Sequence, residues 1–208
     1  MFFITFEGID QSGKSTQLEL LAAGMEAAGL SVLSVREPGG TPLGEAIRGL
    51  LLGPEHQAMD PWAEALLYAA ARAQLVKDVI KPALMSGKIV LSDRFIDSSL
   101  VYQGIARGLG IERIMELNMG ATGGLMPDLT LVFHLGAEAS RARLEGRETG
   151  QDRIESEPIE FHRMVEEGYH RLEEMYPARV AGINAAQTVE EVHAEVVSQC
   201  RERLGIEL

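Results

Sequence analysis

The chain has 208 residues, of which 46% are apolar and 24% charged, and its 31 acidic residues outnumber 19 basic ones to leave a net charge of −12. This composition is that of one globular domain and excludes collagen-like, disulfide-scaffold and wholly disordered chains. The longest stretch without an acidic or basic side chain, residues 117–127, is too short to cross a bilayer as a helix. We therefore expect no association with a membrane.

Further features of the sequence predict the cellular location of the protein and exclude some interactions. The opening apolar residues have no basic region before them and reach Glu7 too soon for a signal peptide, and Cys200 is the only cysteine. These features predict a cytoplasmic protein without an intrachain disulfide. The negative net charge would repel a nucleic-acid backbone, so polymeric nucleic acid is not an expected partner.

Taken in chain order, short apolar runs alternate with longer amphipathic segments. The runs predict strands at residues 2–6, 31–35, 89–91, 129–135 and 180–183, and the segments predict helices over residues 15–28, 61–85 and 158–175. Strands separated by helices are typical of βαβ units with a parallel sheet. The expected fold is an α/β three-layer sandwich, in which helices cover both faces of a five-stranded parallel sheet.

One segment departs in composition from the rest of the chain. Residues 141–157 gather four arginines among acidic residues and glycines. We interpret this segment as a mobile, arginine-rich LID within a single domain of residues 1–208.

Residues 8–15, GIDQSGKS, match the phosphate-binding pattern GxxxxGK[ST] and lie between a predicted strand and a predicted helix. Glycines allow successive backbone N–H groups to face a polyphosphate, while the helix N-terminus adds a favourable dipole. Lys14 is expected to reach the β and γ phosphates, and the Ser15 hydroxyl to bind Mg²⁺. The predicted ATP site comprises Gly8, Ile9, Asp10, Gln11, Ser12, Gly13, Lys14, Ser15 and Thr16.

Asp93 follows the predicted strand at 89–91, where the carboxyl edge of a parallel sheet would deliver it to a ligand. We predict that Asp93 joins Ser15 as a second metal ligand. An aspartate after a strand can also serve as a turn residue. The adjacent Arg94 favours the first interpretation, because neighbouring opposite charges can serve a metal and a phosphate together.

The loop alone does not define the reaction. The chain has no Asn-Lys-x-Asp guanine-reading tetrapeptide, which argues against a GTP-dependent switch.

Tyr68 and Arg72 are four residues apart in a predicted helix, so an aromatic ring and a guanidinium would share one face. Such a pair can stack on a base and donate to its edge; the alternative is a core tyrosine beside a solvated arginine. A phosphoryl-acceptor site is the economical explanation.

Several segments together resemble bacterial thymidylate kinases: EPGG at 37–40, LLYAAAR at 66–72, DRF at 93–95, SSLVYQG at 98–104 and DRIE at 152–155. The resemblance extends over essentially the whole chain. It implies a P-loop nucleoside monophosphate kinase that transfers the γ-phosphoryl group of ATP to dTMP, giving dTDP and ADP, with Mg²⁺ as cofactor and a homodimeric assembly. A kinase of another nucleoside monophosphate or of a deoxynucleoside, and a nucleotide-dependent switch, are the alternatives.

The resemblance also implies roles for individual residues. Tyr68 matches the family's aromatic, usually Phe, that stacks on thymine, and Arg72 matches the arginine on the base carbonyl. Asp10 matches an acid near the sugar 3′-hydroxyl, and Arg48 and Arg94 match groups around the acceptor phosphate and nucleotide. The implied substrate site is completed by Glu37, Ser98, Ser99, Tyr102 and Gln103.

Phosphoryl transfer needs cations more than it needs a base, because the acceptor phosphate already carries nucleophilic oxygens. We expect Lys14 and Arg94 to be two of these cations. Some family members carry a further arginine in the phosphate loop, where this chain has Gln11, and bacterial relatives supply it from the LID. Arg143, Arg147 and Arg153 are the candidates, with Arg147 and Arg153 preferred; the alternative is a solvated face of Arg–Glu pairs.

Two further groups of side chains lie outside the expected site. An apolar stripe on the predicted helix 61–85 is suited to the core or to a subunit interface, and comprises Leu66, Ala70, Ala73, Ile80 and Leu84. The five histidines lack the spacing of metal ligands, so we interpret them as structural or surface residues. They are His56, His134, His162, His170 and His193.

Overall fold

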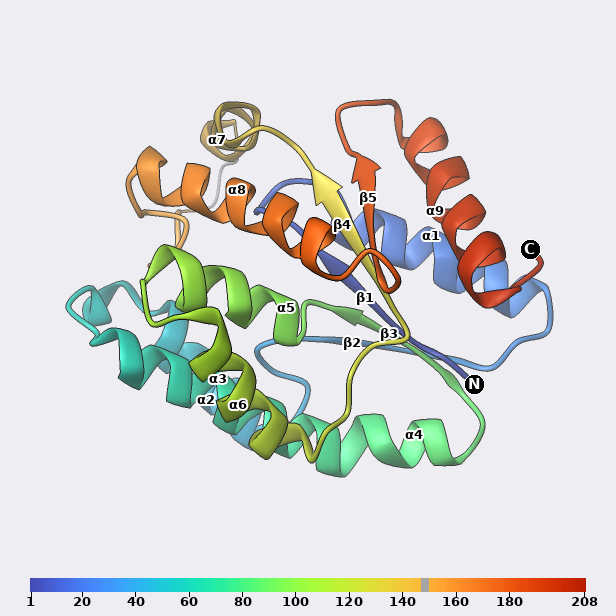
Figure 1. The fold of residues 1–208 in the computed structure, drawn as a ribbon, viewed down its shortest axis with the longest axis horizontal. Helices are drawn as coiled ribbons and strands as arrows, with labels where there is room; N and C mark the ends of the chain where they lie inside the picture. The colour runs from blue at the N-terminus through green and yellow to red at the C-terminus, as the bar shows by residue number, and fades with distance from the viewer. Residues whose placement is uncertain (147–149) are drawn as a thin grey trace.

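The computed structural model describes residues 1–146 and 150–208. Its centre is a five-stranded sheet with strand order β2-β3-β1-β4-β5, in which all neighbouring strands are parallel (Figure 1). The strands are β1 (Phe3–Glu7), β2 (Val32–Arg36), β3 (Ile89–Asp93), β4 (Leu129–His134) and β5 (Val180–Asn184). The predicted α/β fold and its five strands are therefore confirmed, with shifts of one or two residues at their ends.

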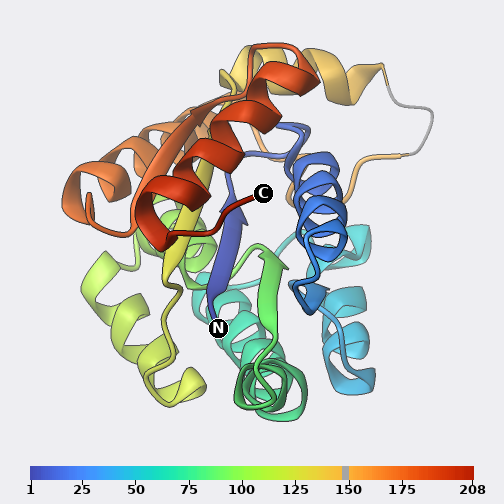
Figure 2. The same cartoon turned by 90° about the vertical axis from the view of Figure 1, so that its right-hand side faces the viewer.

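Helices cover both faces of this sheet (Figures 1 and 2). Helices α1 and α9 pack side by side on one face, whereas α8 packs against η3 on the other. The helical elements are α1 (Lys14–Ala27), α2 (Pro42–Leu52), η1 (Pro54–His56), α3 (Pro61–Leu75), η2 (Val76–Ile80), α4 (Lys81–Met85), α5 (Ile96–Ser99), η3 (Leu100–Ala106), α6 (Ile111–Thr122), α7 (Ala137–Glu145), α8 (Ile159–Met175) and α9 (Val189–Leu204).

The central strand β1 is buried along its whole length, as expected for a strand covered on both faces. Its register pairs Phe6 with Asp93 of β3 and with Leu131 of β4. Because the strands are parallel, their carboxyl ends meet at one edge of the sheet. The loop after Glu7 and the residues after Asp93 consequently lie at this same edge.

The predicted helix at 61–85 is continuous but not uniform. It runs as α3, then a wider π-helical turn, η2, and then α4. Pro82 in α4 has no backbone N–H and its ring would crowd the carbonyl of Asp78 in a regular α-helix. A wider turn before the proline relieves this crowding.

The segment 141–157 differs from the predicted LID at both ends. Helix α7 extends through Glu145, so the first part of the segment is regular helix. After the undescribed residues, Arg153 and Ile154 are buried, with exposed fractions of 1% and 5%. The Asp152 carboxylate accepts the N–H groups of Ile154 and Glu155, each at 2.9 Å. The end of the segment is therefore packed against the body of the protein, which the sequence analysis did not anticipate.

The apolar stripe at 61–85 divides between two environments. Ile80 is fully buried, whereas Leu66 is 54% exposed and Ala70 is also exposed. The stripe therefore lies partly in the core and partly on the outer surface.

Among the described residues, no helix combines the length and the apolar character that a membrane span requires.

Candidate active site

The loop between β1 and α1 is shaped by two glycines. Gly8 has φ +130°, and a Cβ atom there would lie 2.6 Å from the carbonyl oxygen of Phe133, so only glycine fits. Gly13, with φ +90°, directly precedes α1. The loop therefore has the strand-loop-helix geometry that the sequence pattern predicts for a phosphate cradle.

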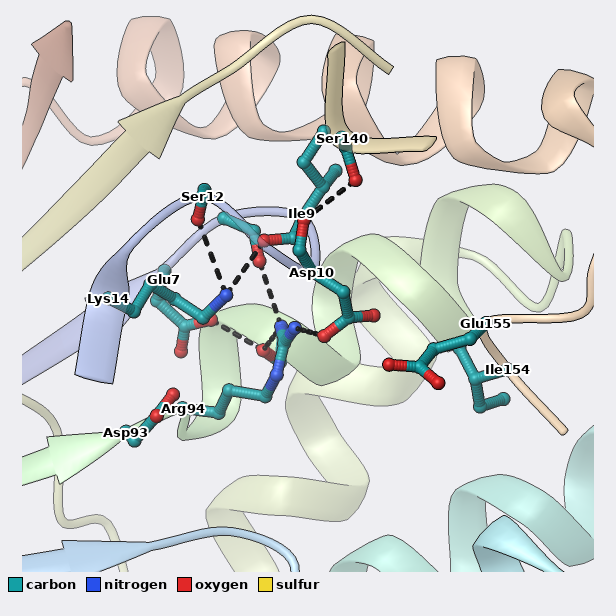
Figure 3. A network of polar contacts seen from close by, with 12 residues as sticks. Glu7, Ile9, Asp10, Ser12, Lys14, Asp93, Arg94, Ser140, Ile154 and Glu155 are labelled. Carbon is teal, nitrogen blue, oxygen red and sulfur yellow. Dashed lines mark hydrogen bonds and ion pairs between the residues drawn. The ribbon is translucent and has the colours of Figure 1, made fainter. Parts of the chain in front are cut away.

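Lys14 is the first residue of α1 and its ammonium group turns back into the loop (Figure 3). Its Nζ atom donates to the Ile9 carbonyl at 2.7 Å and to Ser12 Oγ at 3.4 Å. Burial, together with the neighbouring positive charge of Arg94, lowers the pKa of Lys14 to about 8. A bound polyphosphate would favour the charged form and raise this pKa again.

Ser15 and Asp93 are brought together as the sequence analysis predicted. Ser15 Oγ donates to Asp93 Oδ2 at 2.7 Å, and both residues line the cavity described below. A hydroxyl and a carboxylate are oxygen ligands of the kind that Mg²⁺ prefers. The pair therefore fits a magnesium ion that would bind between the protein and a triphosphate.

Arg94 links the phosphate loop to the segment that follows β3 (Figure 3). Its Nη2 atom lies 2.7 Å from Asp10 Oδ1, and its Nη1 atom donates to the Gly8 carbonyl at 3.0 Å and to Ser98 Oγ at 3.1 Å. Its guanidinium carbon lies 5.3 Å from the centre of the Tyr102 ring. Arg94 has φ +72°, a backbone conformation that is unfavourable for a non-glycine residue, so the hydrogen-bond network holds it there.

Glu7 lies buried beneath this arginine at the end of β1. Its carboxylate accepts from Phe95 N–H at 2.7 Å, from Tyr169 Oη at 2.9 Å and from Ser98 Oγ. Burial and the negative charge of Asp97 raise the pKa of Glu7 to about 7, in spite of these donors. The sequence analysis did not identify Glu7 as a site residue, because its position in an apolar strand indicated nothing about these partners.

On the opposite side of the site, Arg72 is buried and all three of its nitrogen atoms have partners. Nε donates to Glu37 Oε2 at 2.8 Å, Nη1 donates to Ser99 Oγ at 2.9 Å and to Asn118, and Nη2 donates to the Phe95 carbonyl at 2.9 Å. The solvated arginine considered in the sequence analysis is therefore excluded. Burial raises the pKa of Glu37, and the Arg72 charge opposes this shift.

These groups surround a cavity of about 730 Å³ that joins the phosphate loop to α2, α3 and η3. Tyr68 lines this cavity, so its ring is not confined to the hydrophobic interior. The other predicted residues on its wall are Asp10, Gln11, Gly13, Lys14, Ser15, Thr16, Glu37, Arg48, Arg72, Asp93, Arg94, Ser98, Ser99, Tyr102 and Gln103. The predicted acceptor residues and most of the predicted ATP-site residues are thus brought together around one space, whereas Gly8, Ile9 and Ser12 of the phosphate loop do not line it.

Seven of the described residues on the wall were not predicted as site residues, namely Arg36, Pro38, Leu52, Gly150, Asp152, Ile154 and Glu155. Arg36 ends β2, directly before Glu37, and the strand-end position that pointed to Asp93 would have identified it. Its Nη1 atom donates to the Pro38 carbonyl at 2.9 Å, and Arg48 donates to the same oxygen at 3.0 Å. Two arginines therefore converge on one carbonyl group at the acceptor side of the cavity.

Arg153 does not occupy the position expected of a LID cation. Its Nε atom donates to the Leu51 carbonyl at 2.7 Å, and its Nη1 atom lies 2.7 Å from Glu64 Oε2. Both Arg153 and Glu64 are almost completely buried, and neither lines the cavity. Arg153 is therefore a buried structural partner of α3 in this structure. Arg147, the other preferred candidate, lies outside the described residues.

The third candidate, Arg143, reaches the phosphate loop from α7. Its Nη1 atom donates to the Gln11 carbonyl at 3.0 Å. Ser140, one turn earlier on the same helix, donates to the Asp10 carbonyl at 2.7 Å (Figure 3). Helix α7 thus contacts the phosphate loop at Gln11, the position where some family members carry an arginine.

A parallel sheet that carries this glycine loop at its carboxyl edge, on one side of a cavity whose other side is lined by arginines, defines a P-loop kinase of the nucleoside monophosphate kinase type. The family described as thymidylate kinase matches residues 6–196. The chain belongs to the thymidylate kinase family.

Individual relatives agree with this assignment. The chain is 48% identical over 202 residues to a thymidylate kinase of Pelotomaculum thermopropionicum, covering 97% of this chain and 94% of the relative. It is 49% identical to a thymidylate kinase of an Exiguobacterium species, covering 97% and 95%. A crystal structure of thymidylate kinase from Ehrlichia chaffeensis superposes with a TM-score of 0.77 at 35% identity, covering 96% and 98%. The family resemblance and the enzyme class predicted from the sequence are confirmed.

Proposed function

We propose that this protein transfers the γ-phosphoryl group of ATP to dTMP, giving dTDP and ADP. The observation that carries the proposal is the single cavity that has the phosphate loop on one side and Tyr68, Arg72 and Glu37 on the other. One continuous space allows two nucleotides to bind with their phosphates facing each other. In-line transfer between two bound nucleotides requires this arrangement.

The donor triphosphate binds in the loop at residues 8–16, with Lys14 directed at its terminal phosphates. Ser15 and Asp93 would hold Mg²⁺, which would neutralise charge on the transferring phosphoryl group. Arg94 lies between the two nucleotides and stabilises the charge that develops during transfer. No side chain needs to remove a proton, because the acceptor oxygen is already ionised at neutral pH.

We further propose that Arg143 supplies the additional cation, together with Arg147 when the LID closes. The hydrogen bond from Arg143 to the Gln11 carbonyl supports this assignment, since the side chain already lies at the phosphate loop. Closure would also exclude water that could hydrolyse ATP without transfer. Arg153 is assigned a structural role instead.

For the acceptor, we propose that the Tyr68 ring stacks on thymine and that Arg48 and Arg94 bind its phosphate. Arg72 is held by Glu37, Ser99 and Phe95 in a fixed orientation beside the base. Ser98, Tyr102 and Gln103 shape the sugar side of the pocket, and Asp10 accepts from the 3′-hydroxyl group. These polar side chains are held in place before the acceptor binds. An acceptor that leaves them without hydrogen-bond partners is therefore disfavoured.

The decisive experiment measures ADP release with ATP, Mg²⁺ and a panel of acceptors: dTMP, dUMP, dCMP, dGMP and AMP. We expect release that depends on dTMP and on Mg²⁺ and is much slower with the other acceptors. Selective release with another acceptor would support a different monophosphate kinase. ATP binding without acceptor-dependent release would support a nucleotide-dependent switch.

We also propose that the enzyme is a cytoplasmic homodimer, because its two nucleotide substrates are cytoplasmic metabolites and α3 presents an apolar outer face. Trp62 and Leu66 on this face are 39% and 54% exposed, and Leu43 and Leu50 on the neighbouring α2 are 51% and 46% exposed. Exposed apolar side chains on two helices that pack against each other are suited to an interaction surface.

A further inference from the structure

Two of the histidines lie beside each other and beside a carboxylate, although the sequence analysis assigned all five to structural or surface positions. His134 ends β4, whereas His170 and Glu173 lie one turn apart on α8. The rings of His134 and His170 are parallel, with centres 4.0 Å apart. One possible ligand atom from each of the three residues lies within 4.8 Å of the others.

The carboxylate in this cluster is oriented by the backbone of a third element. Glu173 Oε1 accepts from the N–H group of Gly182 in β5 at 3.0 Å, and its other oxygen, Oε2, lies 2.9 Å from His134 Nε2. The side chains of His134 and Glu173 are 20% and 37% exposed, and His170 is exposed. The cluster thus has two partly buried members, His134 and Glu173, and one solvent-exposed member, His170.

We infer that His134, His170 and Glu173 form a binding site for a divalent transition-metal ion such as Zn²⁺. Two imidazoles and one carboxylate are a known zinc ligand set that leaves a fourth position for water. Imidazole nitrogens favour Zn²⁺, Co²⁺ and Ni²⁺, whereas Mg²⁺ prefers oxygen ligands. Because His170 is exposed, its ring can turn until both imidazole nitrogens point at one ion.

A bound ion would connect three elements that are separate in the sequence. It would join the end of β4 to α8 and, through Glu173, to β5. The end of β4 leads into α7, which carries Ser140 and Arg143 to the phosphate loop. The ion would therefore stabilise the base of the segment that approaches the donor nucleotide. This site does not include Ser15 or Asp93 and does not depend on the proposed reaction.

The test uses nucleotide-free, full-length protein in excess Mg²⁺, which occupies oxygen-ligand sites. Zn²⁺ is titrated by calorimetry, and Co²⁺ is titrated by its visible absorption, which reports nitrogen coordination. We expect one ion per chain, and affinities at least about tenfold weaker for His170→Ala and Glu173→Gln. Zn²⁺ should raise the thermal unfolding temperature of the wild type and not that of His170→Ala.

His193→Ala is the matched control, because His193 bonds Gln17 on a different part of the molecule. This variant should bind Zn²⁺ as the wild type does. Unchanged affinity in His170→Ala and Glu173→Gln would overturn the inference, as would an equal loss in His193→Ala or displacement of the ion by Mg²⁺. Circular dichroism of each metal-free variant establishes that the fold is intact before titration.

Discussion

Glu64 and Arg153 form a buried ion pair, with Oε2 of the first 2.7 Å from Nη1 of the second. The same carboxylate accepts from Gln103 at 2.8 Å and from Arg107 at 3.1 Å. Glu64 therefore joins α3 to Gln103 of the nucleotide pocket and to the C-terminal part of the 141–157 segment. This arrangement explains why Arg153 cannot serve as a free cation without breaking contacts in the interior.

Glu64→Gln should strongly destabilise the protein, because it leaves Arg153 buried without a counter-charge. Breaking a buried ion pair by removing one partner costs roughly 3–5 kcal/mol. Urea denaturation would measure the loss in the free energy of unfolding. Glu138→Gln is the control, because its pair with Arg163 is exposed to solvent, and it should leave stability unchanged. Equal losses in the free energy of unfolding of the two variants would show that the buried Glu64 pair contributes no more to stability than an exposed pair.

Arg143→Ala should lower kcat by at least about tenfold and leave the KM for dTMP nearly unchanged, because an arginine at the transferring phosphoryl group stabilises the transition state. Steady-state kinetics with both substrates would measure this split. Arg141→Ala is the matched control, since Arg141 pairs with Glu145 on the exposed side of α7. Arg153→Ala should instead reduce stability. Full turnover in Arg143→Ala would place the additional cation elsewhere.

Tyr68→Ala should raise the KM for dTMP by about tenfold or more, since stacking on a base contributes roughly 1–3 kcal/mol. Tyr68→Phe keeps the ring and should retain most of the affinity. Titration of each variant with dTMP, followed by kinetics, would separate binding from turnover. If the alanine variant bound dTMP as tightly as the wild type, thymine would not lie on this ring.

Glu7→Gln should change how stability depends on pH. In the wild type, the pKa of Glu7 is raised from 4.5 to about 7 in the folded state. The folded protein therefore keeps a proton that the unfolded chain releases, and this residue's contribution makes the free energy of unfolding fall as pH rises from about 4.5 to about 7. The variant lacks this contribution.

Urea denaturation of both proteins at pH 5, 6, 7 and 8 would test this, since other titrating groups contribute equally. Relative to the wild type, the free energy of unfolding of Glu7→Gln should increase by up to about 1.4 kcal/mol per pH unit between about pH 4.5 and about pH 7. It should level off at higher pH. A difference that stays constant over the whole range would mean that Glu7 titrates normally.

Leu66→Glu should convert the proposed homodimer into monomers, because a charge would be buried in the apolar interface on α3. Light scattering coupled to gel filtration would measure the molar mass. Leu20→Glu is a suitable control, because Leu20 is also an exposed leucine, at 38%, but lies on α1. A wild type of monomeric mass would refute the dimer, and a dimeric Leu66→Glu would move its interface to another face.

Much of the donor side could be read from the sequence because its residues are close together in the chain. Residues 8–15 form one loop, and strand and helix periodicities on either side are local signals. Asp93 could be added because parallel strands bring their carboxyl ends to one edge, a rule that needs topology alone. The family resemblance supplied the acceptor side, where contiguous segments such as 66–72 and 98–104 carry the pattern.

What the tertiary structure alone decided is which charges are paired, and this distinguishes Arg143 from Arg153. In the sequence, Arg143 and Arg153 stand in similar acidic surroundings, yet Arg143 reaches the phosphate loop and Arg153 is buried against Glu64. The pairing of Glu7 with Tyr169, and of His134 with His170, likewise depends on elements far apart in the chain. Periodicity and motif spacing report neighbours along the chain, whereas burial and pKa depend on neighbours in space.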